Sequence, residues 1–455
     1  MTQVDQTGRL GTDRIGKLLV EFSIPAIIGM LVNAIYNIVD RIFVGQGVDP
    51  LGIAGITVAM PLMMVIMASS MLIGIGANSL FSIRLGEGRR GEVEKIMGQA
   101  LTLLILVPGL VIIASLVFLD DIIVKILGAS ETVFPFTKEY LQIILYGGIF
   151  SAIGPGINHF IRSDGHPKTS MLTQLIGAII NIILDPLFIF VFHWGIAGAA
   201  WATIISQFIS FVWVMLYFNS RHTRLRFRLA DMKPQISLAL SIMTIGFAPF
   251  VMQLAISLVG VFQNHALNTY GGDIAVSAMG VVYSIIIVFF MPLQGLSMGS
   301  QPIIGFNYGA KKYDRVLGTY RWSVISSTIF VTVSFFLMHL FPAFFIAFFR
   351  IEEGTLMEMC VYCLRVSTLF FPAIGFQVLT SNYFQAVGKP LQGTILSLSR
   401  QLLFYLPLLF VLPRFFKLQG VYFSMPAADF GAIILAAFVM MAELKRMKRL
   451  MHRKD

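Results

Sequence analysis

The chain has 455 residues, of which 57% are hydrophobic and only 12% are charged. Together with a mean hydropathy of +0.82, this composition excludes a soluble globular domain and a disordered chain. The net charge of +10 would suit a polyanionic partner, so the position of the charges along the chain has to decide what it means.

The charged residues form short islands that separate apolar segments, and each segment reaches the roughly 20 residues that a bilayer-spanning helix needs. No segment of that length remains for a soluble domain, and the N-terminus shows no signal peptide with a short apolar region and a cleavage site. We therefore predict an all-α polytopic membrane protein with about twelve transmembrane helices. The predicted spans are residues 15–44, 53–83, 94–118, 135–162, 169–192, 196–218, 236–267, 274–306, 314–341, 355–386, 391–413 and 419–443.

The Lys and Arg residues lie almost entirely in alternate loops. Loops on the side of the N-terminus hold 25 of them and loops on the other side hold 6, while Arg365 and Arg400 fall within segments. This is the positive-inside pattern, which predicts cytoplasmic termini and an even number of spans. The basic charge then reflects topology and contact with anionic membrane lipid rather than nucleic acid.

The chain is built twice. At an offset of 224 residues Asp49 matches Asp273, and after a one-residue slip Gly165 matches Gly388 and Pro167 matches Pro390. Six spans per half return the chain to its starting side, so the halves are parallel repeats that form two pseudo-symmetric six-helix bundles. We expect an N-terminal lobe at 1–218, a basic cytoplasmic linker at 219–235 and a C-terminal lobe at 236–455, with transport by rocking of the lobes.

Polar side chains within the apolar segments of the first half predict a cation site. Intramembrane acids are costly and are functional by default. In the first segment the polar residues follow the i, i+3, i+4, i+7 spacing of one helical face, and two more lie at i and i+4 in the fifth. The set comprises Asn33, Tyr36, Asn37, Asp40, Asn181 and Asp185, with Asn158 and Thr203 in the fourth and sixth segments. Such oxygen-rich groups suit a proton or a hard cation.

Other interpretations of these residues remain open. Asp40 precedes Arg41 and would serve as an interfacial charge, and Asp185 would satisfy backbone groups freed by Pro186. Asn158 and Thr203 would bond neighbouring helices. In the second half, Arg400 and Asp429 would pair with each other or contact substrate.

Several residues are candidates for the lining of a substrate cavity. Methionine adapts to varied apolar ligands, although ordinary helix packing explains it as well, and Pro25 is a candidate hinge. The candidates are Pro25, Asn33, Tyr36, Asn37, Met60, Met64 and Met291. The sequence contains no Walker A pattern, metalloprotease helix or Cys/His cluster, so we expect no enzyme and no cofactor apart from a coupling ion, H⁺ or Na⁺.

Three stretches resemble the MATE family, the multidrug and toxic compound extrusion antiporters, in its DinF-type branch. These are the opening IPAIIGMLVNAIYNIVDRIFVG, the N-I-I-L-D-P of the fifth segment and the G-x-G…L-G loop after the second, within a doubled six-helix plan. The resemblance implies export of amphipathic, often cationic organic compounds in exchange for protons or sodium across a bacterial or archaeal inner membrane. It places cation coupling at Asp40, Asn158, Asn181, Asp185 and Thr203, with sodium at Asp40, Asn181, Asp185 and Thr203. Since two lobes enclose one cavity, we expect a functional monomer.

Two other functions compete with antiport. A lipid-linked precursor flippase of the same superfamily would carry several cavity cations for a pyrophosphate, whereas only Arg365 and Arg400 lie deep in the segments. A membrane-embedded lipid transferase would need a cluster of acid, base or metal ligands at a membrane face, and the sequence shows none.

Overall fold

The computed structural model describes residues 8–220, 223, 225–349, 351 and 354–452, and these contain helices and no strand. The long helices of the first half are α1 (Ile15–Gly47), α2 (Pro50–Gly86), α3 (Arg90–Val117), α5 (Phe134–Ser163), α6 (Pro167–Pro186) with its π-helical extension η3 (Leu187–Val191), and α7 (Gly195–Asn219). Those of the second half are α8 (Ile236–Gly309), α9 (Tyr313–Leu340), α11 (Thr355–Ser367), α12 (Phe371–Ala386), α13 (Pro390–Leu398), η5 (Ser399–Tyr405) and α14 (Leu406–His452). Short elements are η1 (Gly8–Gly11), α4 (Leu119–Asp121), η2 (Ile122–Ile126), η4 (Leu229–Met232) and α10 (Pro342–Ala347).

The predicted plan of spans is confirmed in the described part of the chain. Nine helical stretches are long and apolar enough to cross a membrane. Two of them, Ile236–Gly309 and Pro390–His452, are each divided by one non-helical residue, Gly272 and Lys417, into two spans. A bent pair, α11 with α12, supplies one more. The described residues therefore form the twelve spans of an integral membrane protein.

The segment predicted as one helix at 355–386 is broken. Helices α11 and α12 are separated at residues 368–370 and bend by 50°. Pro372 lies in the first turn of α12, where its missing N–H is harmless. Within a continuous helix it could not donate to the carbonyl oxygen of Thr368, and its ring would clash with that carbonyl group. The proline thus starts a new helix, a boundary that hydropathy alone does not detect.

The repeat is visible in the backbone as well as in the sequence. Gly165 and Gly388 both have positive φ, at 91° and 68°, and so do Gly88 and Lys311, at 76° and 57°. Both pairs are separated by the offset of the sequence repeat. A lysine in the left-handed conformation is uncommon, so the turn geometry is kept even where the glycine is not.

Contacts divide the chain into two compact units. Unit 1 comprises Ile28–Phe250 and the start of the chain through Thr12, and unit 2 comprises Asp13–Ile27 and Val251 onward. Helix α1 therefore passes from unit 2 to unit 1, and α8 passes from unit 1 to unit 2. The lobe boundaries expected from the sequence stay a prediction, and residues 221, 222 and 224 of the predicted linker lie outside the described residues.

Two glycine contacts at matching positions of the repeat hold the first part of α8 in unit 1 and the first part of α1 in unit 2. A Cβ added at Gly76 would lie 2.1 Å from the carbonyl oxygen of Ile242 in unit 1, and one added at Gly299 would lie 2.7 Å from Cα of Ser23 in unit 2. Gly76 and Gly299 occupy matching repeat positions. Only glycine permits backbones to approach this closely.

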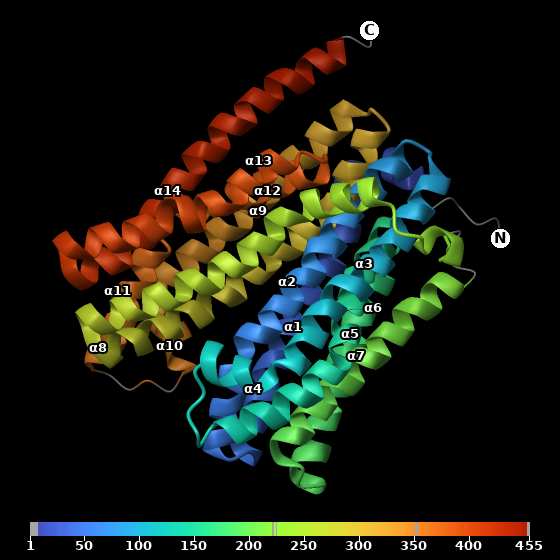
Figure 1. The fold of residues 1–455 in the computed structure, drawn as a ribbon. Helices are drawn as coiled ribbons and strands as arrows, with labels where there is room; N and C mark the ends of the chain where they lie inside the picture. The colour runs from blue at the N-terminus through green and yellow to red at the C-terminus, as the bar shows by residue number, and fades with distance from the viewer. Residues whose placement is uncertain (1–7, 221–222, 224, 350, 352–353, 453–455) are drawn as a thin grey trace. The chain divides into compact units, whose positions relative to one another are not determined.

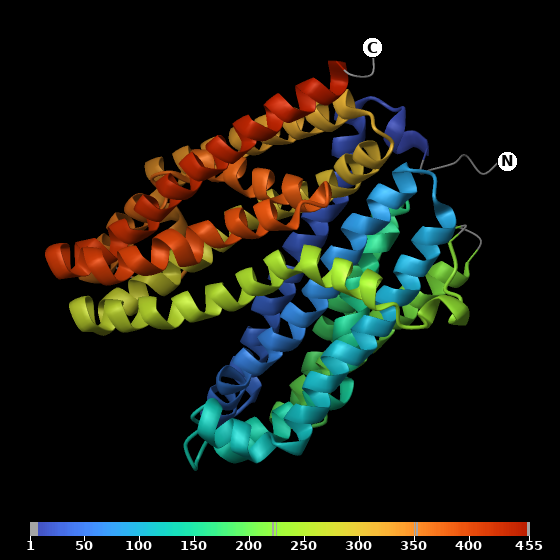
Figure 2. The ribbon, with the colours of Figure 1, turned by 45° about the horizontal axis from the view of Figure 1, so that its top comes forward.

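Within each unit the helices run side by side. In unit 1, α5 lies between α2 and α7 and shares its largest interfaces with them, around buried residues such as Leu141 and Ala200 (Figure 1). In unit 2, α9 packs on α12 and η5 packs on α14. The helices of the C-terminal part of the chain are coloured gold to red in Figure 2. These two helical packings position the polar groups described below.

Candidate functional site

Helices α1 and α6 lie in parallel register in unit 1. Gly29 of α1 lies against Gln174 of α6, and Gly47, at the end of α1, lies against Ile189 of η3. Both contacts join residues separated by nearly the same number of positions. The same offset in residue number brings Asp40 to the level of Asp185. The close contacts at the two glycines, which lie away from the acids, therefore fix the register in which the two acids meet.

Two carboxylates meet at this level. Asp40 lies within hydrogen-bonding reach of Asp185, and the side-chain nitrogen of Asn181 donates to Oδ1 of Asp185 at 3.3 Å. Asp185 is 0% exposed, and its Oδ2 is buried without a hydrogen-bond partner, as is Oδ1 of Asn181. A buried carboxylate oxygen left unpaired is expensive. A proton shared by the two acids or a cation held between them would satisfy it.

Two tyrosines complete the cluster. Tyr36, one turn before Asp40 on α1, and Tyr140 of α5 both interact electrostatically with Asp40 and Asp185. Tyr36 was a sequence candidate, whereas Tyr140 was not. A single tyrosine within an apolar helix forms no polar stripe that the sequence could reveal. Only the packing of α5 beside α6 identifies Tyr140 as a member of the cluster.

The structure does not bring Asn158 into this cluster. Its side-chain nitrogen donates to the carbonyl oxygen of Ser170 at 3.1 Å, at the turn between α5 and α6. On α5, Asn158 lies roughly 27 Å from Tyr140 at the 1.5 Å rise of an α-helix. Its role here is to tie two helices together, the alternative weighed from the sequence.

Thr203 is placed by the register of α6 and α7. These helices run antiparallel, with Gly177 against Ser206 and Ser210, and the hydroxyl of Ser210 donates to the carbonyl oxygen of Thr173. This register brings Thr203, which is partly buried, to the level of Asn181. Among the hydroxyl groups of α7, that of Thr203 is therefore the one whose level along the helix is nearest to the carboxylate pair.

The candidate lining residues are distributed over both units. On α1, Asn33 and Asn37 are exposed, and the side-chain nitrogen of Asn37 donates to Oδ1 of Asn33 at 3.1 Å. Met60 and Met64 are partly buried on α2 in unit 1, while Pro25 and Met291 belong to unit 2.

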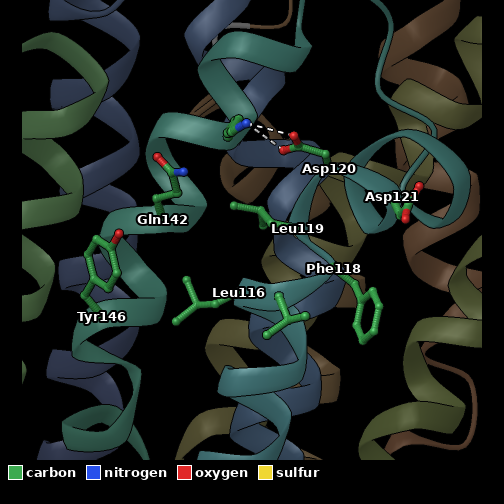
Figure 3. Close-up of a pocket in the computed structure, with 9 residues that line it drawn as sticks. Leu116, Phe118, Leu119, Asp120, Asp121, Gln142 and Tyr146 are labelled. Carbon is green, nitrogen blue, oxygen red and sulfur yellow. Dashed lines mark hydrogen bonds and ion pairs between the residues drawn. The ribbon is translucent and has the colours of Figure 1, made fainter.

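A pocket of about 340 Å³ lies elsewhere in unit 1 (Figure 3). It is bounded by the end of α3, by α4 and by α5, with Asp120, Gln142 and Tyr146 in its lining. Asp120 forms an ion pair of 2.7 Å with Lys138. None of the predicted site residues lines this pocket, so it is separate from the carboxylate cluster.

Arg400 and Asp429 pair with each other in unit 2. Nε of Arg400 lies 2.5 Å from Oδ1 of Asp429, with the side chains 13% and 1% exposed. This was one of the two interpretations left open by the sequence. Among the described residues no group of three or more His, Cys, Asp or Glu could hold a metal ion.

Comparisons with known proteins agree with this architecture. The MatE family model matches residues 25–187 and again residues 248–411. The multidrug export protein MepA of Staphylococcus haemolyticus is 28% identical over 427 residues, which cover 93% of each chain.

Two solved structures show the same fold. One is a MATE protein in complex with MaL6, with a TM-score of 0.91, 23% identity and coverage of 97% of this chain and 99% of the other. The second is an outward-facing multidrug resistance MATE family transporter of the MOP superfamily, with a TM-score of 0.90, 23% identity and coverage of 97% and 98%.

Proposed function

The chain belongs to the MatE family, and on that premise we propose that it exports amphipathic, often cationic organic compounds by exchanging them for protons or sodium ions. The observation that carries the exchange is the buried Asp40–Asp185 pair, with Asp185 Oδ2 left without a partner. The multidrug export protein of S. haemolyticus, similar to this chain along 93% of its length, supports the substrate class.

The coupling ion enters as a transported substrate at the carboxylate pair. A proton would bridge Asp40 and Asp185, whereas sodium would take oxygen ligands from Asp40, Asn181, Asp185 and Thr203, the hard donors that such a cation prefers. The two acids repel each other when both are ionised, so either ion is bound more tightly when they are close together.

Exchange requires that the ion and the organic compound favour different conformations. A ligand shifts a conformational equilibrium only by its differential affinity for the two states. Ion binding that draws α1 toward α6 would favour one state of unit 1, and the organic compound would favour the other. Pro25, on the part of α1 that belongs to unit 2, is the proposed hinge.

The setting of this exchange follows from the family and from the charge pattern. We place the protein in the inner membrane of a bacterium or archaeon with both termini in the cytoplasm, because 25 Lys and Arg residues lie in loops on the side of the N-terminus and 6 lie in loops on the other side. It would act as a monomer in contact with anionic lipid.

Uptake of a fluorescent organic cation into inverted proteoliposomes tests the proposal. A proton gradient and a sodium gradient are imposed separately on wild type, on Asp40→Asn and on Asp121→Asn, a matched change at an exposed acid of the same unit. We expect uptake under one gradient in wild type and Asp121→Asn, and its loss in Asp40→Asn. Undiminished ion-driven uptake by Asp40→Asn would refute the proposed site, and no uptake under either gradient would refute antiport.

A further inference from the structure

Arg162, near the end of α5, is a buried cation without an acidic partner. Its side chain is 3% exposed, and its nitrogen Nη2 donates to the hydroxyl of Ser170 at 3.2 Å. None of the ion pairs among the described residues includes Arg162. Buried charges are normally paired or neutralised, because their removal from water is costly.

Asp164, two residues away, does not neutralise Arg162. It accepts a hydrogen bond from the hydroxyl of Tyr217 at 2.7 Å, and its charged neighbours are His166 and Arg90. Burial raises the pKa of Asp164, while hydrogen bonds from Thr223 and Tyr217 oppose that rise. This acid is thus engaged by groups other than Arg162.

The groups around Arg162 favour an anion. Ser170 lies in the first turn of α6, whose N-cap residue His166 makes no side-chain capping bond. Unpaired N–H groups and the helix dipole make such a helix start attractive to negative charge. In addition, Nδ1 of His159, one turn before Arg162 on α5, is buried without a hydrogen-bond partner.

The internal repeat shows that the helix pair does not need this charge. In unit 2 the position of Arg162 is occupied by Gln385, whose side-chain nitrogen donates to the hydroxyl of Ser397 at 3.3 Å. The tie across the turn is kept, because Ser381 donates to the carbonyl oxygen of Gly393 at 3.4 Å where Asn158 donates to that of Ser170 in unit 1. A neutral side chain therefore suffices to build the turn.

We propose that Arg162 and the N–H groups of the first turn of α6 form a binding site for a small anion. The hydroxyl of Ser170 accepts from Arg162 and donates to the carbonyl oxygen of Asn158 at 3.4 Å, so it positions the guanidinium. Chloride, an inorganic oxyanion such as phosphate, and a small carboxylate share the required chemistry: one negative group that accepts from a guanidinium and from backbone N–H donors. The site is independent of the Asp40–Asp185 pair, since it lies at the opposite end of α5 from Tyr140.

Thermal unfolding of the purified full chain in detergent tests the site. Chloride, phosphate or acetate is titrated at constant ionic strength against gluconate, which is too bulky for a buried site. At about one hundred times its dissociation constant, the anion that binds is expected to raise the unfolding temperature by roughly 2–4 °C. The same unfolding temperature in all three titrations as in gluconate would overturn the proposal.

Variants locate the effect. Arg162→Gln, the residue that unit 2 carries at this position, is expected to abolish the anion dependence, while Arg89→Gln, at an exposed position outside the proposed site, keeps it. Retention of the full dependence by Arg162→Gln would overturn the assignment. If that variant fails to fold, Ser170→Ala is titrated instead. A higher half-saturating concentration is then expected, and an unchanged one contradicts the site.

Discussion

The side-chain nitrogen of Asn181 lies 3.3 Å from Oδ1 of Asp185, one helical turn away, and leaves Oδ2 of the same carboxylate buried and unpartnered. The amide thus orients the acid and leaves its second oxygen free to accept from a proton or a cation. Asp185→Asn should keep the fold and reduce gradient-driven uptake to the passive leak, because the group that binds the ion is gone. Proteoliposome uptake measures this, and Asp120→Asn, an exposed acid of the same unit, should transport normally. Coupled uptake by Asp185→Asn would contradict the role given to this residue.

Tyr140 tests whether the cluster extends beyond the residues found in the sequence. Tyr140→Phe removes a hydroxyl near both carboxylates and retains the ring that packs in the core of unit 1. Loss of about 1 kcal/mol of electrostatic interaction with the ion site corresponds to a change of about fivefold in the ion concentration that gives half-maximal uptake. Tyr146→Phe, at a 65% exposed position of the same helix, serves as the control. Equal half-maximal concentrations in both variants and wild type would exclude Tyr140 from the site.

The Arg400–Asp429 pair should contribute to stability because each charge neutralises the other in the interior of unit 2. Asp429→Asn leaves a buried guanidinium without its counter-ion, and such losses cost about 3–5 kcal/mol. The double variant Arg400→Gln/Asp429→Asn removes both charges and should recover much of that loss. Thermal unfolding in detergent of the two single variants and the double variant measures the coupling. Additive effects of the two substitutions would show that the pair is not coupled.

Gly246 should be intolerant of any side chain. An added Cβ would lie 1.6 Å from the carbonyl oxygen of Leu72, so α8 and α2 would have to separate within unit 1. Overpacking of this kind costs about 1–3 kcal/mol or more, which predicts a lower unfolding temperature and poor yield for Gly246→Ala. Gly260→Ala, on the same helix with nothing within 4 Å of the added atom, is the matched control and should unfold like wild type. Equal stability of the two variants would argue against the close contact.

The sequence by itself determined the twelve spans, the doubled plan and the acids at Asp40 and Asp185. Apolar length and charge spacing are local properties of the chain, and the bilayer imposes the same length on every span. The sequence also located the turns of the repeat, which recur at Gly165 and Gly388. It missed the break before Phe371, because a proline in a first helical turn leaves the hydropathy unchanged.

Only the tertiary structure decided which polar groups meet. The partnership of Asp40 with Asp185 follows from the parallel register of α1 and α6, which contacts at Gly29 and Gly47 fix many residues away. Tyr140 joins the cluster and Asn158 does not, because α5 runs antiparallel to α6 and carries them at opposite ends. Spacing along one helix defines a face, whereas the rotation and register of the neighbouring helices select what that face contacts.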